Sequence, residues 1–323
     1  MRAVVVTEDG PRLQEVPVPR PGRSEVLVRV RAAGLNRADL GMAAGRAHGA
    51  QGGAGTVLGL EWAGEVEAVG AEVTELRPGD RVMCSGAGGY AEYAVADLGR
   101  VSRLPASNIG FAQAATLPVA LQTMHDAVVT NGRLRQGEAV LVQGASSGVG
   151  LMAMQIAREM GAGLVIGTST NPERRARLQE FGAGLAIDTG DAAWPDAVLS
   201  ATDGRGVDLL VDQVSGPMMN ANLRATAILG RIVNVGRLGG ASAPFDFDLH
   251  ALRRIAYVGV TFRTRSVEEV REINRRMRAD LWSALEAGRL QLPVAAEYAL
   301  EEAAEALAHM RANRHFGKIV LRV

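Results

Sequence analysis

One segment of the chain carries residues whose spacing suits chemistry on a phosphate-containing ligand. The apolar run Val140–Val142 leads into a turn of small residues, and an apolar helix is predicted to begin at Leu151. Glycine and serine allow the backbone to approach a pyrophosphate, whose charge is stabilised at the helix N-terminus. The segment therefore predicts a bound dinucleotide. The predicted contacts are Ser146, Ser147, Gly148, Val149 and Gly150.

The glycine spacing of this turn is weak evidence by itself. Ser147 stands where the strict G-x-G-x-x-G motif has its second glycine. Without a ligand, the same residues would form a tight turn between a strand and a helix. The neighbouring elements favour the dinucleotide, because strands that alternate with helices indicate a parallel sheet. The predicted elements are strands over residues 164–167, 207–212 and 231–236 and a helix over residues 173–181.

The two flanks of this region have a different pattern. Short alternating strands separated by glycine turns predict a compact β-barrel, and they are placed at residues 26–30, 65–69 and 81–83. The glycine- and alanine-rich stretch Gly41–Gly55, with His48 at its centre, is predicted to be a mobile loop near the site of the barrel. Helices are predicted over residues 267–288 and 301–312. The last strand, Gly317–Leu321, is predicted to return to the first domain.

Composition limits the classes of function. Hydrophobic residues make up 47% and charged residues 22% of 323 residues, which is typical of globular domains. The formal net charge of +0 argues against nucleic-acid partners and against an anionic membrane surface. The single cysteine, Cys84, excludes disulfides within the chain and multi-cysteine metal sites. No apolar run suits a signal peptide or a membrane span, so we expect a soluble cytoplasmic protein.

Several motifs run from one end of the chain to the other. They are the segments Gly34–Leu40, Gly59–Gly64, Gly79–Val82, Gly89–Tyr93, Leu117–Val119, Gly144–Gly150 and Gly317–Val320. In this order they resemble the medium-chain dehydrogenase/reductase superfamily, and in particular its zinc-independent quinone oxidoreductase branch. The resemblance implies an α/β protein with two domains. A GroES-like β-barrel catalytic domain would span residues 1–118 and 257–323, and a Rossmann NADP-binding domain with a doubly wound parallel sheet would span residues 119–256.

Departures from related families support this branch. Zinc alcohol dehydrogenases of the superfamily carry a cysteine at the position of Asn36 and a histidine at that of Leu60, and catalytic zinc needs about three protein ligands. No metal is therefore predicted. Short-chain dehydrogenases share the glycine spacing but place it near the N-terminus and need a Tyr-x-x-x-Lys pair. The only lysine here, Lys318, follows Arg314 by four residues, so this alternative fails.

The residues after the second strand indicate which nicotinamide cofactor binds. Enzymes that use NAD place an acidic residue at this strand end, whereas enzymes that use NADP supply a cation. This chain has no carboxylate there but has Ser169, Thr170 and Asn171. By resemblance, Arg174 takes the place of a lysine that pairs with the 2′-phosphate, and its guanidinium suits a phosphate. The alternative is a solvated arginine in the first turn of a helix. NADPH is the predicted cofactor.

The resemblance extends the predicted cofactor site. Thr123 would face the nicotinamide, and Thr189 would lie against the adenine. Asn313 and Lys318 would close on the phosphates. Each of these residues also has a packing or surface alternative. The remaining implied contacts are Val214, Gly216, Gly236, Phe262 and Arg263.

The chemistry follows from the lack of a metal or an obvious acid. The hydride acceptor must be electrophilic by itself, such as a quinone or a conjugated enone, and its anion needs hydrogen-bond donors. Asn36 is the first candidate donor, although it could equally hold its loop through backbone hydrogen bonds. Asp39 is predicted to orient residues 36–40. His48 could replace a tyrosine that relatives carry in this loop, or could be a surface histidine.

The predicted function is an NADPH-dependent, zinc-independent reductase that transfers a hydride to a small-molecule quinone or similar conjugated carbonyl compound. One alternative is an enoyl or enone reductase, for which Arg37, Arg46 and Arg263 could bind a pantetheine-linked substrate. Another is a non-catalytic NADPH-binding protein. A homodimer is predicted, because the apolar strand Ile255–Phe262 is suited to joining two sheets edge to edge.

Overall fold

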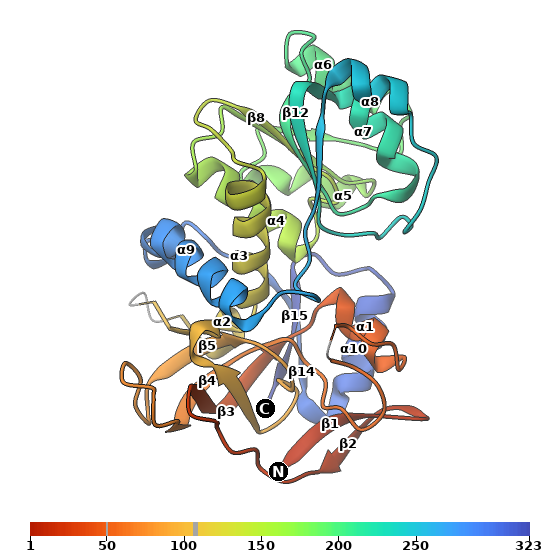
Figure 1. Cartoon of the computed structure of the whole chain (residues 1–323). Helices are drawn as coiled ribbons and strands as arrows, with labels where there is room; N and C mark the ends of the chain where they lie inside the picture. The colour runs from red at the N-terminus through yellow and green to blue at the C-terminus, as the bar shows by residue number, and fades with distance from the viewer. Residues whose placement is uncertain (50, 106–108) are drawn as a thin grey trace. The chain divides into compact units, whose positions relative to one another are not determined.

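The computed structural model describes residues 1–49, 51–105 and 109–323. The chain divides into two compact units. Unit 1 comprises Met1–Val119 and Phe262–Val323, and unit 2 comprises Ala120–Thr261. Both ends of the chain, red to orange and blue in Figure 1, therefore belong to unit 1.

The second boundary between the units differs from the predicted one at residue 257. The strand β13 (Ala256–Gly259) pairs in parallel with β12 (Thr226–Asn234), so a boundary at 257 would cut a paired strand. β13 is also shorter than the strand predicted over Ile255–Phe262. The chain leaves unit 2 only after Thr261, once this pairing has ended.

Unit 1 is built on a seven-stranded sheet in the order β14-β15-β3-β4-β5-β7, with β6 also paired to β3. Its strands are β3 (Glu25–Gly34), β4 (Glu61–Val69), β5 (Arg81–Ser85), β6 (Tyr93–Asp97), β7 (Val101–Arg103), β14 (Val294–Ala299) and β15 (Lys318–Arg322). β15 pairs antiparallel with β3, placing Val320 opposite Gly34. The predicted return of the last strand to the first domain is thus confirmed.

The remaining elements of unit 1 surround this sheet. β1 and β2 form a two-stranded ribbon, and α10 packs near α1 and β15. Their bounds are β1 (Arg2–Thr7), β2 (Gly10–Glu15), α1 (Arg37–Ala43), α2 (Phe111–Ala114), α9 (Val267–Glu286) and α10 (Ala303–Arg311). Among the helices of the described part of the chain, none is long and apolar enough to cross a membrane.

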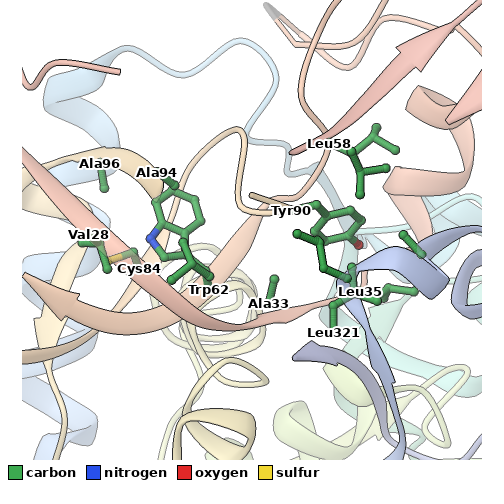
Figure 2. Packing of buried hydrophobic residues seen from close by; sticks show 14 of the residues in the cluster. Val28, Ala33, Leu35, Leu58, Trp62, Cys84, Tyr90, Ala94, Ala96 and Leu321 are labelled. Carbon is green, nitrogen blue, oxygen red and sulfur yellow. The ribbon is translucent and has the colours of Figure 1, made fainter. Parts of the chain in front are cut away.

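The core of unit 1 supports the residues considered below. Trp62 and Cys84 are fully buried and lie close together beside Val28 (Figure 2). The ring of Tyr90 is buried among aliphatic side chains that include Leu35 and Leu58 (Figure 2). Alternating apolar residues of the strands supply this core, so its rigid packing holds the neighbouring polar groups in place.

Unit 2 contains a parallel six-stranded sheet in the order β10-β9-β8-β11-β12-β13. Its elements are β8 (Ala139–Val142), α4 (Gly148–Glu159), β9 (Leu164–Thr168), α5 (Pro172–Ala176), β10 (Leu185–Ile187), α6 (Trp194–Ala201), β11 (Val207–Asp212), α7 (Met219–Ala225), β12, α8 (Phe247–Arg253) and β13. The predicted α/β class with a parallel sheet is confirmed. The strand order reverses between β8 and β11, and open parallel sheets bind ligands at the carboxyl ends of strands beside such a point.

Two helical segments of this unit depart from simple α-helices. The helix predicted over residues 173–181 is α5 followed by a 3₁₀ turn, Leu178–Phe181. Leu178 and Phe181 are the buried residues of that turn, and side chains three residues apart fall on one side of a 3₁₀ helix. Helix α3 (Pro118–His125) continues into a π-helix, Asp126–Asn131.

Candidate functional site

A buried ionic cluster lies in unit 1, where β4 and β15 begin. The Lys318 ammonium donates to Glu61 Oε1 at 2.5 Å and to Asn36 Oδ1 at 2.9 Å. The side chains of Lys318 and Glu61 are 6% and 0% exposed, so this ion pair is shielded from water. Glu61 Oε2 accepts from the backbone N–H of Val119 at 2.8 Å. Buried charges of this kind are retained only when they are paired and hydrogen-bonded.

A close approach of the backbone makes room for this cluster. A side chain at Gly34, in the last position of β3, would meet the carbonyl oxygen of Ala115 at 2.3 Å and Glu61 Oε1 at 2.9 Å. Glycine is therefore required at this position. β3 ends there, and the next turn presents Asn36 to Glu61 and Lys318.

The amide of Asn36 is directed into the cluster. Its Nδ2 donates to Glu61 Oε1 at 2.9 Å and, over a longer 3.4 Å, to the Gly34 carbonyl. Its Oδ1 accepts from Lys318. A donation from Asn36 to a substrate oxyanion would require these bonds to be exchanged. The geometry instead favours the alternative role, in which Asn36 holds the segment between β3 and α1.

Asp39 forms a second buried group next to this cluster. Its Oδ2 accepts from the Tyr90 hydroxyl at 2.5 Å and from the backbone N–H of Asn36 at 2.7 Å, so it ties the start of residues 36–40 to Tyr90. Its Oδ1 is buried and has no hydrogen-bond partner among the described residues. Burial raises the pKa of Asp39 to about 7, although the bonds from Tyr90 and Asn36 and the charge of Lys318 act in the opposite direction.

We expect Asp39 to make stability depend on pH. Because its pKa rises from 3.8 to about 7 on folding, the folded protein holds a proton between about pH 4 and pH 7 that the unfolded chain releases. The contribution of Asp39 to the free energy of unfolding therefore falls across this window, by on the order of 3–4 kcal/mol, and is constant above it. Urea unfolding of the parent and Asp39→Asn at pH 4.5 to 8 measures the difference. Parallel profiles for the two proteins would contradict this expectation.

The loop around His48 lies against the start of the C-terminal part of unit 1. α1 occupies its beginning as far as Ala43, and His48 pairs with Gln51 in a short β-bridge. Gly49 has φ +66, and a side chain there would come within 2.7 Å of the Arg263 carbonyl oxygen. Burial and, to a smaller extent, the charge of Arg263 lower the pKa of His48. His48 is therefore neutral at pH 7, which makes it a weak proton donor.

The C-terminal residues predicted to close on cofactor phosphates divide into two environments. Asn313 is exposed, with a positive φ of 53°, and its Oδ1 accepts from Arg37 at 2.8 Å. Lys318 is buried with Glu61 and Asn36, as described above. An ammonium already paired with a buried carboxylate has little charge left to offer a distant phosphate. The phosphate role of Lys318 is therefore not supported by its surroundings, whereas that of Asn313 stays a prediction.

In unit 2, the turn Gly144–Gly150 joins β8 to α4. Ser147 is the N-cap of α4, and its Oγ accepts from the Gly150 N–H at 3.1 Å and donates to the Gly144 carbonyl at 2.9 Å. Gly144 has φ +64, a conformation that favours glycine. The helix therefore begins at Gly148, three residues before the predicted start. Its N-terminus and the small side chains of the turn suit a pyrophosphate.

Gly150 offers a direct test of this turn. A Cβ at position 150 would lie 2.7 Å from both Ala145 Cα and the Gly144 carbonyl oxygen, and backbone atoms cannot give way easily. We expect Gly150→Ala to lower the free energy of unfolding by about 1–3 kcal/mol and to weaken NADPH binding strongly, because the turn must open. Gly110→Ala is the matched control, since its Cβ would meet no atom of the described residues within 4 Å. Unchanged NADPH affinity in Gly150→Ala, measured by fluorescence titration, would count against the turn as the binding site.

The carboxyl end of β9 carries the residues predicted to bind the adenosine ribose. Ser169 Oγ donates to Ser146 Oγ at 3.2 Å, which joins this end to the glycine turn. Asn171 caps α5, accepting from the Arg174 N–H at 2.9 Å. Arg174 is half-buried in the same helix, and Thr170 is exposed nearby. The segment thus presents hydroxyl, amide and guanidinium groups.

The ends of β11 and β12 form a buried polar network that fixes several predicted residues. Asp212 Oδ1 accepts from the N–H groups of Val214 at 2.9 Å and Ser215 at 2.8 Å. Ser215 adopts φ +56, unusual for a residue other than glycine, and donates to the Gly236 carbonyl at 2.8 Å. Gly216 follows with φ +55. Such strained backbone at strand ends is typical of ligand sites.

The other predicted contacts occupy separate elements. Thr123 lies in α3, and Thr189 lies in the turn after β10; both are half-buried. Phe262 is half-buried and Arg263 exposed at the start of the second segment of unit 1. These positions neither support nor oppose cofactor contact, so their roles stay predictions.

Three residues of these clusters escaped the sequence analysis. Glu61 lies in the Gly59–Gly64 motif, but no role was predicted for it. An acidic residue between Leu60 and Trp62 in an apolar strand nevertheless indicates a buried, paired carboxylate. Tyr90, the donor to Asp39, gave no signal beyond its motif. Arg175 bonds to Asp188 Oδ2 at 2.8 Å and to the Ser169 carbonyl at 2.9 Å, and so fixes the segment that is predicted to bind the ribose.

The residues present in unit 1 do not fit a catalytic zinc ion. Asn36 and Leu60 occupy two positions where zinc needs a thiolate and an imidazole. The Lys318 ammonium lies between Asn36 and Glu61, and a cation there repels a metal ion. Among residues 1–49, 51–105 and 109–323, no group of three or more histidine, cysteine, aspartate or glutamate side chains could hold a metal.

Comparison with known proteins identifies both units. Residues 22–106 match the alcohol dehydrogenase GroES-like domain family, and residues 148–278 match the zinc-binding dehydrogenase family. A mycocerosic acid synthase-like polyketide synthase of Mycolicibacterium smegmatis is 32% identical over 303 residues, which cover 93% of this chain but 14% of that protein. The chain thus spans about a seventh of the curated relatives that it matches.

Solved structures match along the whole chain. An NAD-dependent alcohol dehydrogenase is 30% identical with a TM-score of 0.86, and 100% of both chains is covered. A quinone oxidoreductase of Pseudomonas syringae pv. Tomato DC3000 is 29% identical with a TM-score of 0.87, covering 100% of this chain and 99% of that one. A mycobacterial protein solved with NADPH is 27% identical with a TM-score of 0.88, covering 100% of both. Together these matches show that the chain belongs to the medium-chain dehydrogenase/reductase superfamily and resembles its quinone oxidoreductase branch.

Proposed function

We propose that this protein is an oxidoreductase that uses NADPH to reduce quinones or similar conjugated carbonyl compounds without zinc. The observation that carries the proposal is the Lys318–Glu61–Asn36 cluster, in which a buried ion pair contacts Asn36, the position where zinc alcohol dehydrogenases carry a cysteine ligand. Without a metal to polarise an alcohol or a plain ketone, the acceptor must be electrophilic by itself. Quinones and conjugated enones meet this requirement, because the negative charge that forms is delocalised.

The residues of unit 2 fit the cofactor. The Ser147-capped start of α4 would hold the pyrophosphate, and Arg174 with Ser169 and Asn171 would hold the 2′-phosphate of the adenosine ribose. When bound, NADPH supplies the hydride, and the protein supplies position and charge. The similar mycobacterial structure that contains NADPH supports this choice, and the similar NAD-dependent alcohol dehydrogenase makes it necessary to test NADH.

The direct experiment follows oxidation of NADPH and of NADH by the metal-stripped protein. Ortho- and para-quinones are compared with conjugated enals and with an enoyl thioester. We expect NADPH-specific turnover of quinones that does not change when zinc is added. A requirement for added zinc, or a preference for NADH, would contradict the proposal.

A second candidate function is enoyl reduction, and the polyketide synthase relatives favour it. Arg37, Arg46 and Arg263 of unit 1 are exposed and would suit the phosphate of a pantetheine-linked thioester. In the same experiment, turnover confined to the enoyl thioester would establish this function in place of quinone reduction. Tight NADPH binding without turnover of any acceptor would instead indicate a non-catalytic NADPH-binding protein.

We also propose that the protein is a homodimer joined at β13. β13 is the edge strand of the unit 2 sheet, with Tyr257 44% exposed, and Phe247 and Leu252 are 77% and 68% exposed. An exposed edge strand, in a unit that also exposes large apolar side chains on α8, favours pairing with a second copy about a two-fold axis. We expect sedimentation equilibrium to give a dimer and Tyr257→Lys, which places charge at the edge, to give a monomer. A monomeric parent protein would disprove the dimer.

A further inference from the structure

Lys318 is the single lysine of a chain that contains 35 lysine and arginine residues together. Every other permanently cationic side chain is therefore an arginine, including those in ion pairs such as Arg271 with Asp97 and Arg231 with Glu138. Arginine satisfies an ion pair at least as well as lysine, but its guanidinium does not release a proton in proteins. The ammonium of lysine can release one. A lone lysine at a buried site thus indicates proton chemistry rather than charge alone.

The surroundings of Lys318 leave one of its hydrogens available. The ammonium has three N–H bonds, of which one is directed to Glu61 Oε1 and one to Asn36 Oδ1. No third partner of the ammonium is found among the described residues. Glu61 is itself held by the Val119 N–H, and Asn36 is half-buried, so the edge of the cluster reaches solvent at Asn36. Two bonds therefore orient the ammonium, and with three N–H groups and two acceptors among the described residues one N–H is left for a ligand to accept.

We propose that Lys318 is the proton donor to the oxyanion that forms when the acceptor has received a hydride. This inference rests on the proposed function. The added electron pair is located on the acceptor oxygen as a phenolate or enolate. That oxygen forms an O–H bond while one N–H bond of Lys318 breaks, which leaves a neutral amine and a hydroquinone or enol. A proton from water then restores the ammonium, so each turnover consumes one hydride and one proton.

Glu61 and Asn36 are positioning residues in this scheme. Both accept from Lys318 and therefore fix the direction of its remaining N–H. The carboxylate of Glu61 forms the buried ion pair with the ammonium and is fully buried itself. This arrangement also explains why the Asn36 amide is turned inward: it orients the donor and is not the donor.

The single lysine makes a direct test possible. Protein labelled with ¹⁵N-lysine gives one Nζ signal, which is followed while NADP⁺ and then 4-nitrophenolate, a stable phenolate, are added. We expect a saturable shift of the signal with 4-nitrophenolate and little change with NADP⁺ alone. A shift with NADP⁺ and none with 4-nitrophenolate would overturn the proposal in favour of the phosphate role, and no shift with either would also overturn it.

Kinetics of variants provide the second test. Lys318→Arg keeps the charge and can bond to the same two oxygens, but it cannot release a proton. We expect its single-turnover rate with a quinone to fall by about 10²–10⁴, as for loss of a general acid, with NADPH affinity unchanged. The double variant Lys318→Met with Glu61→Gln removes both buried charges and should lose rate similarly. A near-parental rate in either folded variant would overturn the proposal.

Two controls separate this proposal from the proposed function. Arg322 lies in the same strand as Lys318 and pairs with Glu297 at 3.6 Å on the surface, so the double variant Arg322→Met with Glu297→Gln should keep the parental rate. If the parent protein reduces no quinone or enone, the proposed function fails. The ¹⁵N experiment then still decides whether Lys318 contacts an oxyanion.

Discussion

Replacing Lys318 by methionine is expected to lower the free energy of unfolding by about 3–5 kcal/mol. The substitution leaves Glu61 fully buried, with its Oε1 deprived of the ammonium 2.5 Å away. Removing one partner of a buried ion pair is more costly than removing both, because the remaining charge has no compensation. Urea unfolding at pH 8, above the window in which Asp39 titrates, measures this loss without interference from that carboxyl group.

The double variant with Glu61→Gln provides the control for this prediction. The introduced amide side chain retains an oxygen for the Val119 N–H and an NH₂ group that can reach Asn36, and no buried charge remains. We expect the double variant to recover most of the stability lost in Lys318→Met. If the free energy of unfolding fell equally in the single and the double variant, the packing of the side chains, and not their charge, would be what stabilises this cluster.

Changing Arg174 to alanine is expected to raise the KM for NADPH by about 10- to 100-fold and to leave the KM for NADH unchanged. A charge-assisted bond from a guanidinium to a phosphate contributes roughly 1.5–3 kcal/mol, and NADH has no phosphate at this position. Steady-state rates with both cofactors and one saturating quinone provide the measurement. Equal effects on the two cofactors would mean that Arg174 supports the fold of the segment rather than the phosphate.

Variants of Arg177 and Arg175 provide the controls for this experiment. Arg177 follows shortly after Arg174 and pairs with Glu180 on the surface, so Arg177→Ala should alter neither KM. Arg175 bonds to Asp188 and to the Ser169 carbonyl. Arg175→Ala should therefore impair both cofactors by loosening the whole segment. The contrast separates contact with the phosphate from support of the loop.

Local patterns in the sequence were sufficient to predict the main strands and helices and the fold class. The alternation of strands and helices in residues 140–236 predicts a parallel sheet, because apolar periodicity and turn residues act within a few positions of one another. The Gly144–Gly150 turn could be predicted for the same reason, since its conformation is set locally by its own glycines and by Ser147. The short 3₁₀ turn Leu178–Phe181 and the end of β13 were missed, because packing decides how far a short element extends.

The candidate site of unit 1 could not be derived in this way. Lys318 and Glu61 are 257 positions apart, and Lys318 and Asn36 are 282 apart, so no spacing rule connects them. They meet because β15 pairs with β3 and because Gly34 allows Glu61 to approach. The raised pKa of Asp39 likewise comes from burial by the surrounding core. The sequence by itself determined the α/β class with its parallel sheet, the turn between β8 and α4, and the absence of a cysteine at position 36 and of a histidine at position 60. Only the tertiary structure decided the partners of Lys318, because contact and desolvation depend on which distant segments pack together.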